Sequence, residues 1–304
     1  MHKSGARASL YVSAYYLLYE RENHNENNIM NKLVIGCGYL GRRVAQLWQQ
    51  QGHTVFATTR NNRTAEEFRN RGLQPIICDV MNRVNLSVLP KVDTVLYAVG
   101  LDRSSGYSMR DVYVQGLTNV LEHLPTPEKF LHISSTSVYA QTDGQEVEES
   151  AETAPTEANG QVVLAAEQVL HSTIPTAMIL RFAGIYGPDR WLRRKTIESG
   201  EAFVSDRDKW LNLIHVDDGA RIVLAAEEHY QPGEVLNVSD DLPVKRADFY
   251  GFMAELLKAE LRMTSPPENE TGPNRRISNH KMYEKLGVKL QYPTYAEGLT
   301  ASQE

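Results

Sequence analysis

Three closely spaced glycines suit backbone contact with a negatively charged ligand. Residues 31–41 read Asn-Lys-Leu-Val-Ile-Gly-Cys-Gly-Tyr-Leu-Gly, so Gly36, Gly38 and Gly41 form the pattern G-x-G-x-x-G directly after an apolar run. The first glycine permits a tight turn, the second lets the backbone approach a pyrophosphate, and the third lets a helix pack on the strand. Because free N–H groups at a helix start attract anions, the pattern predicts a dinucleotide-binding loop.

A run of hydroxyl side chains forms a second candidate site. Residues 134–139 read Ser-Ser-Thr-Ser-Val-Tyr and follow a predicted strand that begins at Phe130. A hydroxyl can donate to a carbonyl oxygen and accept from an alcohol, and this run is expected at the edge of the predicted cofactor crevice.

Alternating strands and helices are expected to position both sites. Apolar strands are predicted near residues 31–35, 53–59, 73–80, 92–99 and 130–134, with helices between them. This alternation predicts an α/β fold with a doubly wound parallel sheet of the Rossmann type, whose ligand crevice lies at the carboxyl ends of the strands.

An arginine after the second predicted strand indicates which dinucleotide is bound. Thr58 and Thr59 end that strand and Arg60 follows, where an NAD-selective enzyme usually presents an acidic side chain to the ribose 2′-hydroxyl. Arginine suits a 2′-phosphate instead, so we expect NADP, with NAD less favoured; the alternative is that Arg60 is simply an exposed arginine. The residues expected to contact the cofactor are Gly36, Gly38, Tyr39, Leu40, Gly41, Arg60, Asp79 and Val80.

The alternation ends near residue 186, which predicts two domains. Residues 30–185 form the expected NAD(P)-binding domain and residues 186–304 a smaller substrate lobe, from which a strand at 235–238 returns to the main sheet. Residues 1–29 are an extra segment that we expect to be disordered or absent from the native chain, with Met30 as the functional start. Its apolar run, residues 10–19, is too short to span a bilayer as a helix.

Composition narrows the classes of partner and compartment. A net charge of -6 disfavours nucleic acid and anionic membranes, and 41% hydrophobic residues allow a substantial core. Only Cys37 and Cys78 are present and no zinc spacing occurs, so we expect no metal and a reducing cytoplasm. Cys37 in the glycine loop is either a redox-sensitive thiolate near a helix start or a small packing side chain.

Four segments in order resemble a known family. They are the glycine loop, the hydroxyl run, Arg-Phe-Ala-Gly-Ile-Tyr-Gly-Pro at 181–188 and Ile-His-Val-Asp-Asp at 214–218. Over residues 30 to about 240 the chain resembles the extended and atypical short-chain dehydrogenase/reductases of the NAD(P)-dependent epimerase/dehydratase group. With the segments at 276–279 and 298–299 it is similar to the bacterial YeeZ-like atypical members.

The resemblance implies roles for residues and also reveals a departure. Ser135 stands where the family's serine or threonine polarises the substrate. The family's catalytic tyrosine and lysine correspond to Asn159 and Val163, and neither residue can exchange a proton at neutral pH. A substitute acid is therefore expected, and the candidates near the crevice are Tyr139, Tyr186 and Tyr113.

Two functions follow from this departure. The first is an NADP-dependent oxidoreductase or epimerase-like enzyme of a small metabolite or nucleotide sugar, with Ser135 in its site and Arg190 available for an anionic substrate group. The second is a non-catalytic NADP(H)-binding redox sensor or regulatory protein that has lost the tyrosine and lysine. The resemblance also implies a homodimer through the predicted helices at 108–124 and 160–171.

Overall fold

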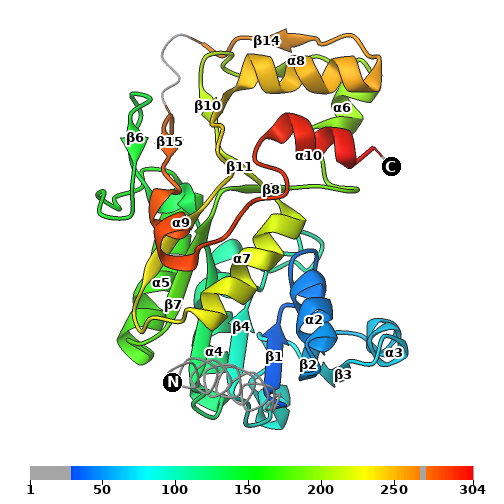
Figure 1. Ribbon diagram of the computed structural model, residues 1–304, viewed down its shortest axis with the longest axis vertical. Helices are drawn as coiled ribbons and strands as arrows, with labels where there is room; N and C mark the ends of the chain where they lie inside the picture. Colours follow the sequence, from blue (N-terminus) through cyan, green and yellow to red (C-terminus); the bar gives the residue numbers. More distant parts are fainter. Residues whose placement is uncertain (1–28, 268–271, 304) are drawn as a thin grey trace, which may run out of the picture.

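A parallel sheet forms the centre of the computed structural model, which describes residues 29–267 and 272–303 (Figure 1). Its seven strands lie in the order β12-β7-β5-β4-β1-β2-β3, and every neighbouring pair is parallel. The strands are β1 (Asn31–Ile35), β2 (Thr54–Thr59), β3 (Gln74–Ile77), β4 (Thr94–Tyr97), β5 (Lys129–Ser135), β7 (Met178–Phe182) and β12 (Val235–Val238). The strand order reverses between β1 and β4, so the expected Rossmann-type fold is confirmed and a crevice opens there.

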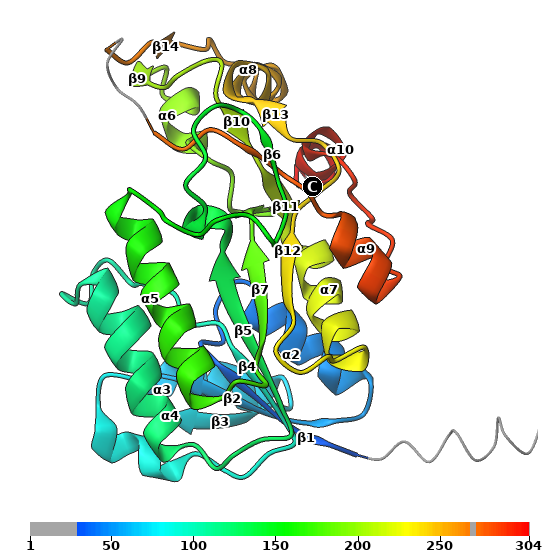
Figure 2. The same ribbon diagram turned by 90° about the vertical axis from the view of Figure 1, so that its left-hand side faces the viewer.

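Helices cover both faces of this sheet, as Figure 2 shows. On one face α2 packs beside α7, and their apolar residues share one core with α9; on the other face α4 and α5 pack together over a second core. The helices of this part are α2 (Gly41–Gln50), α3 (Asn62–Asn70), α4 (Gly116–His123), α5 (Ala158–Thr173), α7 (Val216–Glu228) and α9 (His280–Leu286). A π-helical turn, η2 (Asp111–Gln115), precedes α4.

A smaller lobe lies beyond the carboxyl ends of the strands, at the top of Figure 1. Its core joins apolar side chains of α6, α8 and α10, among them Phe249, Met253 and Leu299. Its elements are β8 (Gly184–Tyr186), α6 (Arg194–Glu198), β9 (Phe203–Val204), β10 (Trp210–Leu211), β11 (Leu213–His215), β13 (Val244–Lys245), α8 (Arg246–Leu257), β14 (Met263–Thr264) and α10 (Tyr295–Ala301). Between its segments the chain returns once to the main sheet as β12, which pairs with β7.

The acidic composition of segment 141–158 predicts a surface loop, but the segment contains a short strand. This strand, β6 (Glu146–Val147), pairs in parallel with β15 (Arg276–Ile277). Nearby, a Glu149 carboxylate oxygen accepts from the backbone N–H of Asn237 in β12 at 2.6 Å. The segment therefore helps to attach the C-terminal part of the chain to the sheet.

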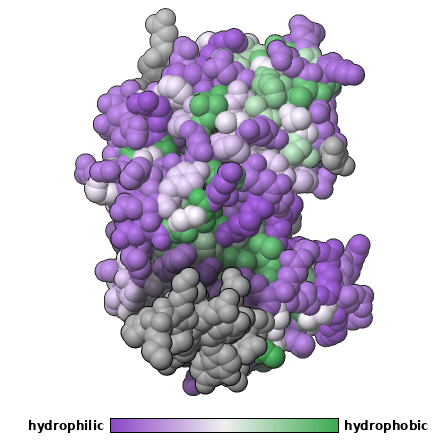
Figure 3. Space-filling view, in the orientation of Figure 1, coloured by the Kyte–Doolittle hydropathy of each residue, from purple (hydrophilic) through white to green (hydrophobic). Residues whose placement is uncertain are grey.

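The described residues include no helix long and apolar enough to cross a membrane. Hydrophilic residues cover most of the face in Figure 3, and the apolar ones gather in separate patches. The expected extra segment, apart from its last residue, lies outside the described residues.

Candidate cofactor and active site

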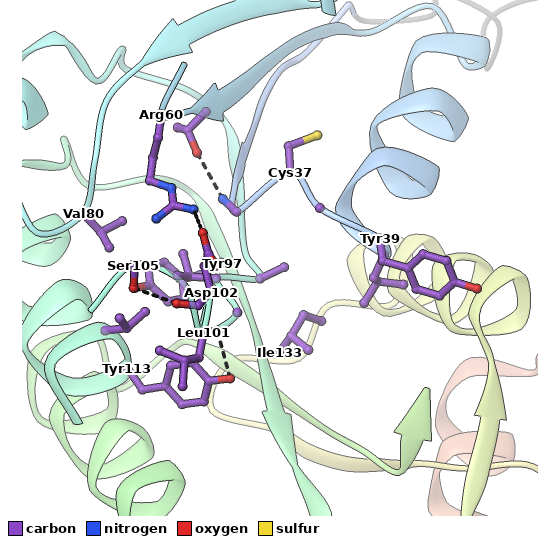
Figure 4. Close-up of a pocket in the computed structure, with 18 of the residues that line it drawn as sticks. Cys37, Tyr39, Arg60, Val80, Tyr97, Leu101, Asp102, Ser105, Tyr113 and Ile133 are labelled. Carbon is purple, nitrogen blue, oxygen red and sulfur yellow. Dashed lines mark hydrogen bonds and ion pairs between the residues drawn. The ribbon is translucent and has the colours of Figure 1, made fainter. Parts of the chain in front are cut away.

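One cavity of about 540 Å³ lies at the carboxyl ends of β1, β2, β4 and β5 (Figure 4). Its volume falls within the usual range for small-molecule and cofactor sites. The glycine loop forms one wall, and the residues after β2, β3 and β4 form another. Ser134 and Ser135 at the end of β5, with Val163 and Ala166 of α5, complete the lining, so the start of the hydroxyl run shares one cavity with the glycine loop.

The geometry of the glycine loop explains why glycine is needed. Gly36 has φ +86°, and a Cβ there would lie 2.6 Å from backbone atoms of Ala98. A Cβ on Gly41 would lie 2.8 Å from the Gly36 carbonyl oxygen, which matches its expected helix-packing role. At Gly38 a Cβ would meet nothing within 4 Å, so this backbone faces open space. Thr58 Oγ1 holds the loop by accepting from Gly36 N at 3.0 Å.

Seven of the eight expected cofactor contacts line this cavity. They are Gly36, Gly38, Tyr39, Leu40, Arg60, Asp79 and Val80. Gly41 lies behind the loop at the start of α2. The backbone cradle, the adjacent helix start and the side chains after β2 and β3 together fit a dinucleotide.

Cys37 is 6% exposed and packs in the core beneath the loop. Burial raises the pKa of its thiol to about 12, although the charge of Arg42 acts in the opposite direction. The thiol is therefore protonated at neutral pH, which favours the packing role over the reactive thiolate.

Ser135 lines the cavity at the end of β5. Its Oγ accepts from Ser137 N at 3.2 Å and so caps the short 3₁₀ turn η3 (Thr136–Val138). Because this bond uses a lone pair, the hydroxyl proton of Ser135 is still available to a substrate oxygen.

Tyr139 and Tyr186 do not line the cavity; both side chains are buried elsewhere. The Tyr139 hydroxyl donates to Asn237 Oδ1 at 2.7 Å and accepts from Arg181 Nη1 at 3.0 Å. The Tyr186 hydroxyl donates to the Thr294 carbonyl at 3.3 Å. Both hydroxyls thus have structural partners, and burial raises the pKa of each.

The third tyrosine, Tyr113, does line the cavity. It stands on the π-helical turn η2, and its hydroxyl accepts from Leu101 N at 3.4 Å (Figure 4). On α5, Val163 also lines the cavity, whereas Asn159 is exposed and does not. Of the three candidate tyrosines, Tyr113 is thus the one that lines the cavity.

Two buried polar side chains in the cavity lining were not expected from the sequence. Tyr97 and His132 are register partners on β4 and β5, and their rings stack with centroids 5.6 Å apart. Among the described residues, neither Tyr97 Oη nor His132 Nδ1 has a hydrogen-bond partner. Burial lowers the pKa of His132 to about 4, so the ring is neutral at physiological pH. The only signal in the sequence was a histidine two residues before the hydroxyl run.

Arg190 brings a cation to the cavity from the smaller lobe. Its guanidinium lies 5.3 Å from the ring centroid of Tyr39, and Arg43 lies 4.5 Å from the same ring. The Tyr39 hydroxyl donates to the Pro188 carbonyl at 2.8 Å, which joins the glycine loop to the turn that carries Arg190. Because Arg43 is paired with Asp217, an anionic ligand in the cavity would meet the charge of Arg190 on this side.

Comparisons with known proteins agree with this geometry. The chain is 26% identical to protein YeeZ of Escherichia coli K12 over 279 residues, which are 86% of this chain and 95% of that protein. A structure of a functionally unknown conserved protein from Silicibacter pomeroyi superposes with a TM-score of 0.72 at 28% identity, covering 90% of this chain and 98% of that one. UDP-glucuronic acid 4-epimerase from Bacillus cereus, solved with UDP-glucuronic acid and NAD, shares the fold with a TM-score of 0.75 at 21% identity over 90% and 98% of the two chains.

The model of the NAD dependent epimerase/dehydratase family matches residues 33–239. That range begins in β1 and ends just after β12, so it includes every strand of the sheet. The resemblance inferred from the four sequence segments is thus confirmed, and the protein belongs to the NAD dependent epimerase/dehydratase family of NAD(P)-dependent enzymes.

Proposed function

We propose that this protein is an NADP-preferring oxidoreductase or epimerase-like enzyme that acts on a small metabolite or nucleotide sugar. The observation that carries the proposal is that Ser135 and the glycine loop line one cavity, which Tyr113 also reaches. The dinucleotide, when bound, supplies hydride transfer at its nicotinamide ring.

The residues of the chain have separate roles in this proposal. The backbone of the glycine loop and the start of α2 hold the pyrophosphate, and Arg60 meets the ribose 2′-phosphate. The Ser135 hydroxyl donates a hydrogen bond to the substrate oxygen and so orients the substrate. Tyr113 replaces the family's tyrosine as the proton donor or acceptor, and Arg190 attracts an anionic group of the substrate.

A turnover screen tests this function. Purified protein is incubated with NADPH or NADP and a panel of carbonyl compounds, alcohols and nucleotide sugars, and cofactor absorbance and product formation are followed. We expect Ser135→Ala and Tyr113→Phe each to lower kcat by about 10²–10⁴-fold, the usual contribution of acid–base groups. Tyr107→Phe is the matched control, because Tyr107 lines the same cavity and is 44% exposed.

The alternative function gives a different result in the same screen. A sensor or regulatory protein would bind NADPH tightly and turn over no member of the panel. Its motivation is that Asn159 and Val163 stand where the family carries its tyrosine and lysine. Turnover that survives in both Ser135→Ala and Tyr113→Phe would reject the assigned roles but not the enzyme.

Two coarser expectations also remain proposals. We propose a homodimer through α4 and α5, supported by the partly exposed apolar residues Val162, Ala165 and Val169 along α5; the molecular mass in solution tests it.

We propose a cytoplasmic location because both cysteines are buried free thiols, which a reducing compartment maintains; cell fractionation tests it.

A further inference from the structure

An ion pair crosses the cavity at the end where the second strand stops. Arg60 follows β2, and Asp102 lies in the loop after β4; both line the cavity. Arg60 Nη2 donates to Asp102 Oδ2, and Figure 4 shows the contact. The arginine expected to meet a 2′-phosphate is therefore already held by a carboxylate.

The carboxylate of Asp102 is fixed independently of Arg60. Its Oδ1 accepts from Ser104 N at 3.0 Å and from Ser104 Oγ at 2.6 Å, and its backbone carbonyl accepts from Ser105 Oγ at 2.7 Å. The hydrogen bonds from Ser104 and then the contact with Arg60 lower the pKa of Asp102 to about 2. Asp102 thus stays ionised and in place when Arg60 turns to another anion.

We propose that Asp102 determines the choice between the phosphorylated and the unphosphorylated dinucleotide. The inference rests on the proposed dinucleotide binding and deepens it. A 2′-phosphate must compete with Asp102 for Arg60, and it would also be repelled by the negative charge of the Asp102 carboxylate. A ribose 2′-hydroxyl instead finds in Oδ2 of Asp102 the acidic acceptor that the end of β2 lacks.

Separating Arg60 from Asp102, so that either side chain can contact the cofactor, costs little free energy. The side chains of Arg60 and Asp102 are 47% and 41% exposed. An exposed ion pair contributes little to stability, so either cofactor can replace it. The site therefore accepts both dinucleotides, and the carboxylate limits the preference that Arg60 alone would give.

Two ligands that lack the nicotinamide test the part of the site that contacts the ribose 2′ position. ADP-ribose and 2′-phospho-ADP-ribose differ only in the 2′-phosphate, and calorimetry gives the ratio of their Kd values. We expect Asp102→Asn to shift this ratio about fivefold toward the phosphorylated ligand, which is the upper end of the range for an exposed pair. Arg60→Ala should shift it the other way, and Asp102→Asn made in the Arg60→Ala background should give a smaller shift than in the wild type.

Asp111→Asn is the matched control. Asp111 accepts from Ser108 N and Oγ as Asp102 does from Ser104, but it is exposed and does not line the cavity. An unchanged ratio in Asp102→Asn, or an equal shift in Asp111→Asn, would overturn the inference while leaving the proposed function intact. If neither ligand bound the wild-type chain, dinucleotide binding and this inference would both be rejected.

Discussion

At the scale of single residues, Tyr139 and Tyr113 show how position decides the role of a phenol. Tyr139 is 1% exposed and belongs to a buried network with Asn237, Arg181 and Glu167. Tyr113 lines the cavity, and its hydroxyl accepts a hydrogen bond from the backbone N–H of Leu101. The resemblance made both tyrosines candidates, but the sequence does not show which face each hydroxyl reaches, because that depends on the packing of distant strands.

We expect Tyr139→Phe to lower stability and leave kcat/KM unchanged. The change removes the donor to Asn237 Oδ1 and an acceptor for Arg181, and an unpaired buried polar group costs about 1–3 kcal/mol. Urea denaturation measures the loss, and Tyr113→Phe should show the opposite pattern of intact stability and reduced turnover. A fall in kcat for Tyr139→Phe with unchanged stability would return this tyrosine to the catalytic candidates.

The neutral His132 also predicts a dependence of stability on pH. Its folded pKa of about 4 lies below the ordinary value of 6.5, so between these values the unfolded chain binds more protons than the folded one. The unfolding free energy should therefore fall as the pH falls from 6.5 to 4, by about 3 kcal/mol from this residue.

Denaturation at a series of pH values measures this effect. His132→Phe should flatten the curve between pH 6.5 and 4, because phenylalanine can keep the stacking on Tyr97 without titrating. The same change at His171, an exposed residue of α5, should leave the slope as in the wild type. An equal slope in His132→Phe and the wild type would contradict the prediction.

At the scale of elements, the sequence predicts the presence of helices and strands more accurately than the residue at which each helix begins. The sequence Thr64-Ala-Glu-Glu67 has the spacing of a capping box, but α3 begins at Asn62 and its cap is Asn61, whose side chain accepts from Thr64 N at 2.8 Å. Likewise α7 is capped by His215, whose side chain accepts from Asp217 N. In both cases the extended residue just before the helix presents its side chain to the free N–H groups.

The π-helical turn η2 could not be read from apolar periodicity either. Residues 108–124 have the pattern of one regular helix, but an extra residue is accommodated at Asp111–Gln115 before α4 begins. Such turns often mark functional sites, and this one carries Tyr113.

A buried ion pair connects the first strand to α7. Lys32 Nζ lies 2.6 Å from Glu227 Oε1, their side chains are 4% and 6% exposed, and Thr94 donates to the same oxygen. We expect Glu227→Gln to lower the unfolding free energy by about 3–5 kcal/mol, because Lys32 would stay buried without its anion.

Replacing both partners separates charge from packing. Lys32→Met with Glu227→Leu should recover most of the loss, since apolar residues of similar volume can replace a buried pair. Glu66→Gln is the control on α3, where the pair with Arg69 is 64% and 54% exposed and should contribute less than about 1 kcal/mol. A similar loss in Glu66→Gln and Glu227→Gln would show that burial does not set the cost.

At the scale of the whole molecule, the Rossmann-type sheet was predictable because apolar strands alternate with amphipathic helices over the first half of the chain, as in β1, α2 and β2. The contacts between its two lobes were not. The pairing of β6 with β15 joins positions about 130 residues apart, through two short strands without an apolar pattern. Family membership follows from motifs along the sequence, whereas the attachment of the C-terminal segment depends on such long-range contacts.

The return of β12 to the sheet affects how this chain can fold during its synthesis. Until residue 238 has left the ribosome, β7 has no neighbour on its outer side, and its five buried residues end in an open sheet edge. Open apolar edges pair with other chains, so the nascent protein passes through an aggregation-prone interval of more than fifty residues. The seven-stranded sheet is therefore complete only after β12 has been made.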